Sequence, residues 1–367
     1  MIMVDYIQKF ILKRFFPFKD WISDLKNPKI LQADIIAGVT VALVLVPQSM
    51  AYAQLAGLPP YYGLYASFLP VAIASIFGSS RQLATGPVAV VSLLTAAALE
   101  PIASSDPTGY IAYAIMLAFL VGLFQLCLGL LRLGVLVDFL SHPVVTGFTN
   151  AAAIIIATSQ LSKLFGVSVV SQEHHYQTIM MVISESLVST HTPTLLMGLL
   201  AIFIILFVRR ISNKYPSVLI SVVITTLISW YIKFETNFGG KVIGVVPDGL
   251  PSIQMPQIDV TQLVNLGTVA IAISLIGFME AISIAKAMAT QTKQRLDADQ
   301  ELIGQGLSNL ASSFFQGYPV SGSFSRSAVN ISAGAVTGFS SVVTGLVVGI
   351  TLLFLTPLLY HLPQATL

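Results

Sequence analysis

Charged residues are scarce in this chain. It has 18 Lys and Arg and 16 Asp and Glu among 367 residues, whereas 55% of the residues are apolar. A soluble protein of this length carries about 90 charged side chains, so the composition excludes an ordinary globular enzyme and a disordered chain. The formal net charge of +2 provides no basic face, which excludes a nucleic-acid-binding protein.

Cysteine and clustered metal ligands are also nearly absent. The single cysteine, Cys127, lies in an apolar run, so there is no disulfide framework and no cysteine metal site. The Glu-His-His run at 173–175 has no second ligand cluster, and a solvated loop is the better interpretation. The Ser141-His142 pair precedes Pro143, where helix capping is its expected role. We therefore expect no enzyme activity, no catalytic residues, no cofactor and no metal.

Long apolar runs fill most of the chain. A membrane-spanning helix needs about 20 apolar residues. Two apolar segments are too short to span, Val88–Leu99 and Phe324–Ala333, and each follows a break that contains glycine and proline, at 85–87 and 317–322. Nine segments are predicted to span: Ala33–Ala53, Tyr61–Phe77, Tyr110–Leu131, Pro143–Gln160, Pro193–Val208, Pro216–Ile232, Leu263–Ala289, Leu302–Phe315 and Val336–Leu359. The sequence thus predicts an all-α polytopic membrane protein.

The basic residues predict an orientation, because loops rich in Lys and Arg stay in the cytoplasm. With the N-terminus inside, most of the 18 basic residues fall on the cytoplasmic side, and only Arg326 lies within a membrane segment. We expect a multi-pass protein of the plasma or bacterial inner membrane with a cytoplasmic N-terminus.

Three segments outside the spans have their own predictions. Residues 1–30 are expected to form an amphipathic helix on the cytoplasmic leaflet, with a basic tail as the alternative. The stretches Phe165–Thr192 and Lys233–Gln262 are expected to be extracellular loops.

The two short segments are the most informative feature. They are separated by the same offset of about 230 residues as two of the long helices. This favours two inverted repeats of seven helices each, with the half-helices meeting at a binding site in the bilayer midplane. The alternative is a coincidence of breaks in a chain with 26 Gly and 18 Pro.

Such a site would be positive. Each helix N-terminus carries about half a unit of positive charge, and Arg326 lies one turn into the second short segment. Hydroxyl groups gather at the same place: Thr85, Ser321, Ser323, Ser325 and Ser327. Sulfate, bicarbonate, chloride and dicarboxylates fit the sign, and a dianion fits the magnitude best. The alternative for Arg326 is an ion pair with Glu280 or a side chain that reaches the inner face.

Glu280 is the only acidic residue between Leu263 and Ala289. A carboxylate in apolar surroundings can exchange a proton near neutral pH. Protonation would remove a charge that repels the anion, so proton and anion binding would become coupled. A fixed ion pair with Arg326 is the alternative, and the two roles can coexist.

Several motifs resemble those of the sulfate permease (SulP) anion transporters. The most specific is Pro59–Pro70 (PPYYGLYASFLP). The others, in chain order, are Val46–Ala53 (VPQSMAYA), Thr85–Pro87 (TGP), Ser141–Val144 (SHPV), Gly277–Ala281 (GFMEA), Glu301–Asn309 (ELIGQGLSN) and Ser323–Ser327 (SFSRS). The resemblance extends from about Asp34 to the last residue.

This resemblance implies a fold of two inverted seven-helix repeats that form a core domain and a gate domain. It implies a cytoplasmic N-terminus at 1–30 and a transmembrane domain at 31–367. Within that domain it implies a core at about 31–135 and 262–360 and a gate whose first part is about 136–261. Family members continue with three more helices and a STAS domain, so we expect the gate to be incomplete in this chain and the STAS domain to be absent from it.

The resemblance also implies site residues and a function. The positions that match anion contacts in the family are Gln48, Tyr52, Val88, Ser323, Phe324, Ser325 and, just behind them, Arg326. Thr85 joins this set from its place in the first break. Glu280 matches the acid of proton-coupled sulfate carriers, whereas bicarbonate carriers use a sodium site with another acidic pattern.

We therefore expect secondary-active, proton-coupled sulfate uptake by alternating access. The alternatives are a bicarbonate, chloride or dicarboxylate transporter or exchanger, or an anion channel of the same fold. We expect the lipid bilayer as its surroundings, a homodimer for the full-length protein and no nucleic-acid partner.

Overall fold

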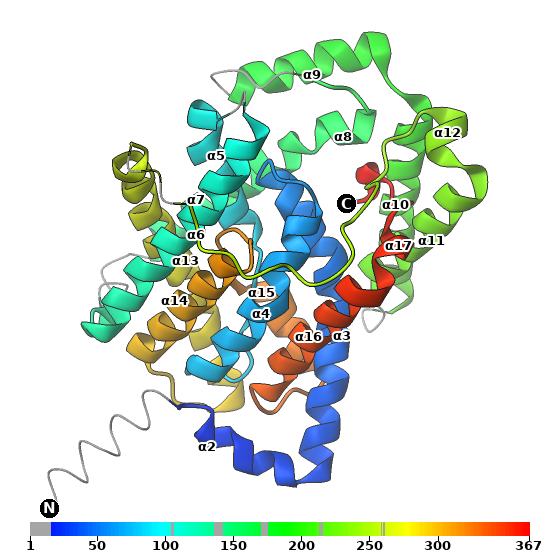
Figure 1. The fold of residues 1–367 in the computed structure, drawn as a ribbon. Coiled ribbons are helices and arrows are strands. Elements are labelled where there is room, and N and C mark those ends of the chain that lie inside the picture. Colours follow the sequence, from blue (N-terminus) through cyan, green and yellow to red (C-terminus); the bar gives the residue numbers. More distant parts are fainter. Residues whose placement is uncertain are drawn as a thin grey trace, which may run out of the picture. The chain divides into compact units, whose positions relative to one another are not determined.

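The computed structural model describes residues 16–103, 106–135, 142–169, 175–212, 216–257, 259 and 261–367. Helices make up most of these segments (Figure 1). In chain order the main elements are α2 (Lys19–Ile22), α3 (Pro28–Leu55), α4 (Tyr61–Phe77), β1 (Ala84–Gly86), α5 (Ala89–Ala103), α6 (Pro107–Leu130), α7 (His142–Ser159), α8 (Leu161–Phe165), α9 (His175–Ser189), α10 (Thr192–Ile211), α11 (Ser217–Ile232), α12 (Phe234–Phe238), α13 (Leu263–Thr292), α14 (Ala298–Phe314), β2 (Ser321–Ser323), α15 (Phe324–Ser332), α16 (Phe339–Ile350) and α17 (Thr356–Leu359). Short 3-10 turns cover Ser23–Lys26 and Gln364–Thr366, and a π-helical turn covers Thr351–Leu355. The all-α prediction is confirmed.

Packing divides the chain into two units. The first comprises residues 1–145 and 250–350, and the second comprises 146–249 and 351–367. The first unit holds both strands and the helices α3 to α6 and α13 to α16. The assignment of core and gate roles to parts of the chain stays a prediction, because the grouping of residues does not reveal which part moves.

Within the first unit, α14 packs against α6 and α4, and α16 packs against α3 and α4. Two glycines allow α6 and α14 to approach closely. A Cβ atom on Gly306 would come within 2.6 Å of the backbone N of Leu126, and one on Gly122 within 2.6 Å of the backbone N of Leu310. Small residues at such contacts are typical of helices packed within membranes.

Within the second unit, α10 packs against α11. The Ser221 hydroxyl on α11 donates a hydrogen bond of 3.0 Å to the carbonyl of Ala201 on α10. Met197, Phe234 and Val242 form a small apolar cluster beside these helices. These contacts stabilise the second unit by itself.

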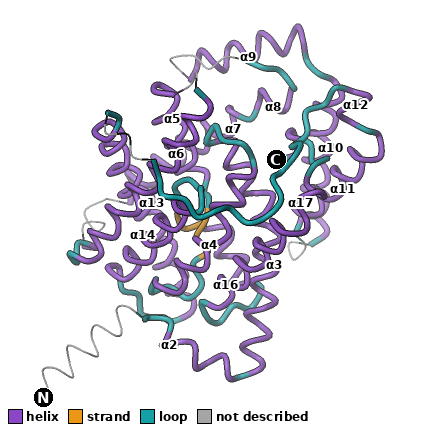
Figure 2. Tube along the Cα trace, in the orientation of Figure 1, coloured by secondary structure: helices purple, strands orange, loops and turns teal. Residues whose placement is uncertain are grey.

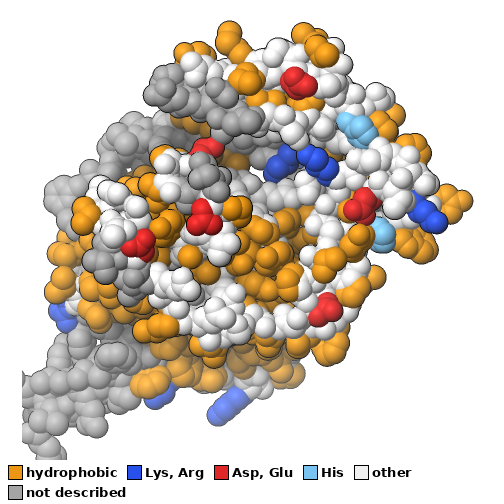
Figure 3. Space-filling model, turned by 45° about the horizontal axis from the view of Figure 1, so that its top comes forward, with side chains coloured by type: hydrophobic (Ala, Val, Ile, Leu, Met, Phe, Trp, Pro, Cys, Tyr) orange, Lys and Arg blue, Asp and Glu red, His pale blue; other side chains and the backbone are white. Residues whose placement is uncertain are grey.

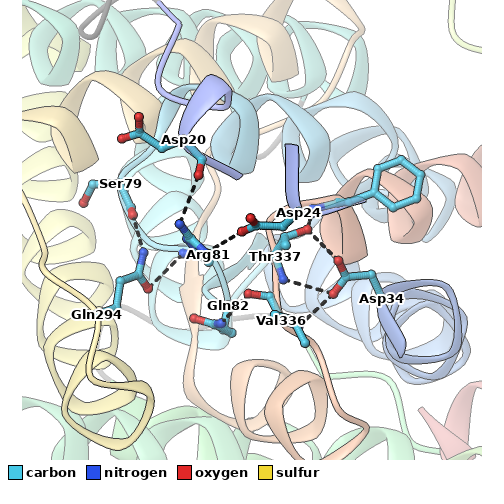
Figure 4. A network of polar contacts seen from close by, with 10 residues as sticks. Asp20, Asp24, Asp34, Ser79, Arg81, Gln82, Gln294, Val336 and Thr337 are labelled. Carbon is cyan, nitrogen blue, oxygen red and sulfur yellow. Dashed lines mark hydrogen bonds and ion pairs between the residues drawn. The ribbon is translucent and has the colours of Figure 1, made fainter. Parts of the chain in front are cut away.

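Two networks of polar contacts hold the segments that precede β1 and α16 (Figure 4). Arg81 forms an ion pair of 3.2 Å with Asp24, and its Nη2 donates to the carbonyl of Asp20. The amide of Gln294 accepts from the backbone N–H of Arg81 and donates to the carbonyl of Ser79. The turn before β1 is therefore held from both sides.

The second network is centred on Asp34, which is fully buried in α3 and holds the chain before α16. Its Oδ1 accepts from the backbone N–H groups of Val336 and Thr337 at 2.7 and 3.0 Å. Gln82 donates to the carbonyl of Val336 at 3.1 Å. The chain between α15 and α16 is thus tied to α3 and to the start of β1.

By length and composition alone, five helices within the described ranges could cross a membrane: α3, α6, α10, α13 and the helical run Phe339–Leu359. Shorter apolar helices include α4 and α11. Large apolar side chains such as Leu196, Phe203 and Leu206 on α10 are exposed. Hydrophobic side chains likewise cover much of the face in Figure 3, where Lys and Arg are few. Such a surface suits lipid rather than water.

Three sequence predictions need correction or comment. The stretch Phe165–Thr192 is not a loop, because α9 occupies His175–Ser189 within it. Its uninterrupted apolar run, Ile179–Ile183, is short and is flanked by polar residues, so no long apolar run indicated a helix. The predicted span Val336–Leu359 corresponds to the helical run Phe339–Leu359, which contains the π-helical turn. Most of the predicted N-terminal amphipathic helix, residues 1–15, lies outside the described residues.

Candidate anion-binding site

The two strands place the two half-helices together. β1 and β2 pair antiparallel, with Ala84 opposite Ser323, Thr85 opposite Gly322 and Gly86 opposite Ser321. Figure 2 shows the two short strands side by side (orange). α5 begins three residues after β1, and α15 begins directly after β2. Because the strands pair antiparallel, α5 and α15 leave the strand pair at its opposite ends and run in opposite directions. Both helix N-termini therefore adjoin this short strand pair, the meeting point of the two half-helices that the sequence predicts.

Both half-helices are short. At 15 and 9 residues, they extend about 22 and 14 Å, less than the roughly 30 Å of a bilayer core. The first four N–H groups of each helix have no partner within the helix. The meeting point therefore carries positive partial charge from two helix ends.

Arg326 adds a full charge at this point. The side chain is completely buried in the first unit. Its Nη1 donates to Oε1 of Gln48 at 3.1 Å, while Nε and Nη2 have no hydrogen-bond partner within the described ranges. Nη2 lies against Gly86, where an added Cβ would be 3.4 Å away. A buried guanidinium with unused donors is costly unless a ligand or water satisfies it.

Gln48 and Tyr52 extend this arrangement along α3. They are four residues apart and so lie on the same face of the helix. Nε2 of Gln48 donates to the Tyr52 hydroxyl at 3.0 Å, while its Oε1 accepts from Arg326. The amide is therefore oriented, and the hydroxyl hydrogen of Tyr52 remains available as a donor.

The hydroxyl groups divide into two sets. Ser321 donates to the carbonyl of Gly277, and Ser327 donates to that of Ser323, at 2.6 and 2.7 Å. These two groups hold the backbone. The Oγ atoms of Ser323 and Ser325 lie 3.4 Å apart and bond to each other. Because neither hydroxyl holds the backbone, both can rotate to donate to a ligand instead.

The remaining predicted contacts differ in exposure. Val88, which directly precedes α5, is 4% exposed, whereas Phe324 at the start of α15 is 60% exposed. Thr85 is buried and accepts a hydrogen bond of 2.9 Å from Nε2 of Gln305. Thr85 therefore ties β1 to α14, and its role in anion binding stays a prediction.

Glu280 approaches the same region from α13. Its Oε2 is buried and has no hydrogen-bond partner among the residues described. The predicted alternative of a fixed ion pair with Arg326 is wrong, because within the described ranges Arg326 forms no ion pair and bonds to Gln48 instead. The two charges are still close enough to interact electrostatically.

Two residues at the site had no signal in the sequence. Tyr318, which is fully buried, has its hydroxyl 3.1 Å from that of Ser92 on α5. This contact joins the first half-helix to the segment before β2. Tyr318 lies in the Gly317–Gly322 break, which indicated only an interruption of the helix. No local pattern indicated its partner.

Metal ligands do not gather anywhere in the described part of the chain: no group of three His, Cys, Asp or Glu side chains is positioned to hold an ion. His175 begins α9, while Glu173 and His174 lie outside the described residues.

Comparison with known proteins identifies this architecture. The sequence profile of the sulfate permease family matches residues 31–367. The chain belongs to the sulfate permease family. Its multiple apolar helices and this membership make it a multi-pass membrane protein.

Two curated relatives are transporters. The chloroplastic sulfate transporter 4.1 of Arabidopsis thaliana is 40% identical over 375 residues, which cover 100% of this chain and 53% of that protein. The sodium-independent sulfate anion transporter of Bos taurus is 33% identical, over 97% of this chain and 63% of that protein. The chain therefore spans about half the length of the first of these relatives.

Solved structures share the fold. SLC26A9 superposes with a TM-score of 0.92 at 26% identity, over 99% of this chain and 60% of that chain. The transmembrane domain of the cyanobacterial bicarbonate transporter BicA superposes with a TM-score of 0.82 at 26% identity, over 92% and 86% of the two chains. The predicted transporter fold of the family is thus confirmed.

Proposed function

We propose that this chain forms the transmembrane part of a secondary-active transporter for a small inorganic anion, with sulfate as the substrate. The observation that carries the proposal is Arg326, a buried cation with two unused donor nitrogens where two helix N-termini meet. Positive charge in a low-dielectric pocket favours an anion, and it favours a dianion more strongly.

The site residues of this proposal are Gln48, Tyr52, Thr85, Val88, Ser323, Phe324, Ser325 and Arg326. Arg326, Ser323, Ser325 and Tyr52 would donate to the anion, and Val88 and Phe324 would form its apolar wall. Sulfate is favoured because the curated relatives described above carry sulfate transport in their names. Bicarbonate is the second candidate, because the chain superposes on the bicarbonate transporter BicA.

We further propose that a proton is cotransported through Glu280. This carboxylate has a buried oxygen without a partner and lies near Arg326 without forming an ion pair. When Glu280 is charged, it weakens the attraction between the pocket and an anion. When it is protonated, that repulsion is removed. Proton and anion would therefore enter together.

Radiolabelled sulfate uptake into liposomes tests this proposal. The full-length protein is reconstituted with and without an inward proton gradient, and unlabelled bicarbonate and chloride are added as competitors. We expect the gradient to stimulate uptake in wild type and in the control Glu235→Gln, which removes an exposed carboxylate. We expect no stimulation in Glu280→Gln.

Two results would contradict the proposal. Equal stimulation in Glu280→Gln and wild type would remove the proton-coupling role of Glu280. No uptake of labelled sulfate above protein-free liposomes, with or without the gradient, would remove sulfate as the substrate.

A further inference from the structure

One face of α14 carries a row of buried polar side chains. Glu301, Gln305, Asn309 and Ser312 follow one another at intervals of four, four and three residues, which places them along one side of the helix. Each is at most 2% exposed. Buried polar groups are costly unless they are hydrogen-bonded, so the partners of this row indicate why it is there.

The first two residues of the row hold the segment of β1. Oε2 of Glu301 accepts from the backbone N–H groups of Ser80 and Ser79, at 2.9 and 3.0 Å. Nε2 of Gln305 donates to Oγ1 of Thr85 at 2.9 Å. The turn before β1 and the strand itself are therefore both fixed to α14.

The last two residues hold the segment of β2. Oδ1 of Asn309 accepts from the backbone N–H of Val320 at 2.8 Å, and its Nδ2 lies 3.0 Å from the carbonyl oxygen of the same residue. The side-chain amide thus pairs with Val320 as a neighbouring strand would. Ser312 donates to the carbonyl of Tyr318 at 2.7 Å.

The orientation of the Asn309 amide is set by two further helices. Its Nδ2 lies 3.0 Å from Oε1 of Gln125 on α6, and Nε2 of Gln125 donates to the carbonyl of Ser274 on α13. Since Nδ2 faces only oxygen acceptors, Oδ1 must face the N–H of Val320. Asn309 therefore joins α6, α13 and α14 to the residue that precedes β2.

We propose that Asn309 is a positioning residue for the anion site. It fixes where β2 ends and α15 begins, and so where Ser323, Ser325 and Arg326 stand relative to the start of α5. Glu301 and Gln305 do the same for β1 from the same helix face. Asn309 acts through the backbone of Val320 rather than through contact with the anion. The inference rests on the proposed anion-binding function.

Small displacements at such a site are expensive, because a helix end acts on charge only within its first turn. Asn309→Asp keeps the acceptor for Val320 N–H but replaces the NH2 group with oxygen, which then faces the oxygens of Val320 and Gln125. Repulsion between these acceptors displaces the segment. At low pH the introduced carboxyl regains a proton and a donor.

The test is calorimetric titration of the purified full-length protein with sulfate at about pH 8 and about pH 5. We expect Asn309→Asp to raise the Kd about tenfold or more over wild type at the higher pH, equivalent to about 1.4 kcal/mol. We expect the ratio of the Asn309→Asp Kd to the wild-type Kd to be smaller at the lower pH. Asn309→Ala is expected to raise the Kd at both.

Ser308→Ala is the matched control. Ser308 neighbours Asn309, is fully buried and donates one hydrogen bond of 2.8 Å to the carbonyl of Pro70 on α4, so it supports no strand. We expect this variant to lose thermal stability while its Kd stays within about twofold of wild type. If the Asn309 variants do not fold, Gln125→Met serves instead, because it removes the acceptor that orients the amide. Its Kd is expected to rise severalfold.

The outcomes separate the positioning role from the anion-binding function. The positioning role alone would be overturned if wild type binds sulfate and the Asn309 variants bind it with the same Kd. The same holds for Gln125→Met if it is used in their place. Equal losses of affinity in Ser308→Ala and Asn309→Ala would also overturn it, since general destabilisation would then explain both. Wild type that binds no sulfate would overturn the proposed function, and this inference with it.

Discussion

The two strand and half-helix segments are alike in backbone but differ in chemistry. Each has a three-residue strand followed by a short helix, and the two strands pair with each other. α5 begins with apolar residues, and its only charged residue, Glu100, lies in its last turn. α15 contains Arg326 and follows a strand rich in serine.

The two segments therefore have different roles: the first provides apolar surface, and the second provides charge and hydroxyl groups. In the proposed site, the first segment supplies a helix end and the apolar side chain of Val88. The second supplies a helix end, the Arg326 guanidinium and the hydroxyls of Ser323 and Ser325, which bond to each other. If this division is correct, substitutions in the second segment change anion affinity, and matched substitutions in the first change it little.

The largest effect is expected from Arg326→Met. A hydrogen bond to a charged group contributes about 1.5–3 kcal/mol, so the Kd for sulfate should rise by roughly 10- to 150-fold. The melting temperature of the variant should rise, because the substitution removes a buried charge that lacks an acidic partner. Titration calorimetry and a thermal melt measure the two quantities.

The same variant can break the comparison. Unchanged affinity would show that the two helix ends bind the anion without Arg326. A large loss of thermal stability would show that Arg326 supports the fold, and the loss of affinity would then say nothing about charge.

A smaller effect is expected from Ser323→Ala. A neutral hydrogen bond contributes about 0.5–1.5 kcal/mol, so the Kd should rise by roughly two- to tenfold. The matched variant is Ser92→Ala in the first segment, which removes a buried hydroxyl that bonds Tyr318. We expect its Kd to stay within about twofold of wild type. Equal losses in the two variants would remove the distinction between the segments.

The smallest effect is expected outside both segments, at Asp259. Its carboxylate accepts hydrogen bonds from the hydroxyl and backbone N–H of Thr261 and from the Tyr113 hydroxyl. These bonds, those from Thr261 first, hold the pKa of Asp259 below its usual range. Because the folded-state pKa is lowered, the stabilisation is present above the unfolded value of about 3.9 and is lost as the pH falls below it.

Asp259→Asn should therefore lower the melting temperature slightly at neutral pH, and the difference from wild type should vanish in acid. Sulfate affinity should not change. Thermal melts across the acid range measure the first effect. A lower affinity would show that the segment before α13 influences the site, which would contradict its independence from both half-helix segments.

Some features of the fold and site could be predicted because their signals are local. The breaks at 85–87 and 317–322 contain the glycine and proline that end helices, so the starts of both short helices were predicted to within about a residue or two. Arg326 stood out because a charge in an apolar run is unusual. Gln48, Tyr52 and Val88, in contrast, were proposed as site residues only from the resemblance to the family.

Other features depend on neighbours distant in sequence. Nothing beside Arg326 indicates that it bonds to Gln48, and nothing beside Tyr318 indicates Ser92. The Glu301–Asn309 motif was visible, but its polar residues show their purpose only when β1 and β2 lie against α14. The helix α9 was missed because its apolar run, Ile179–Ile183, is too short to be recognised in a search for membrane-spanning segments.

The proposed anion site can be located directly in a structure of the full-length protein with selenate, an isostere of sulfate that is identified by its selenium atom. We predict one selenium peak at the meeting point of α5 and α15, within hydrogen-bonding distance of the Arg326 guanidinium and of N–H groups in the first turns of both helices. Ordered selenate elsewhere in the transmembrane region, with this pocket empty at saturating concentration, would contradict the proposed site.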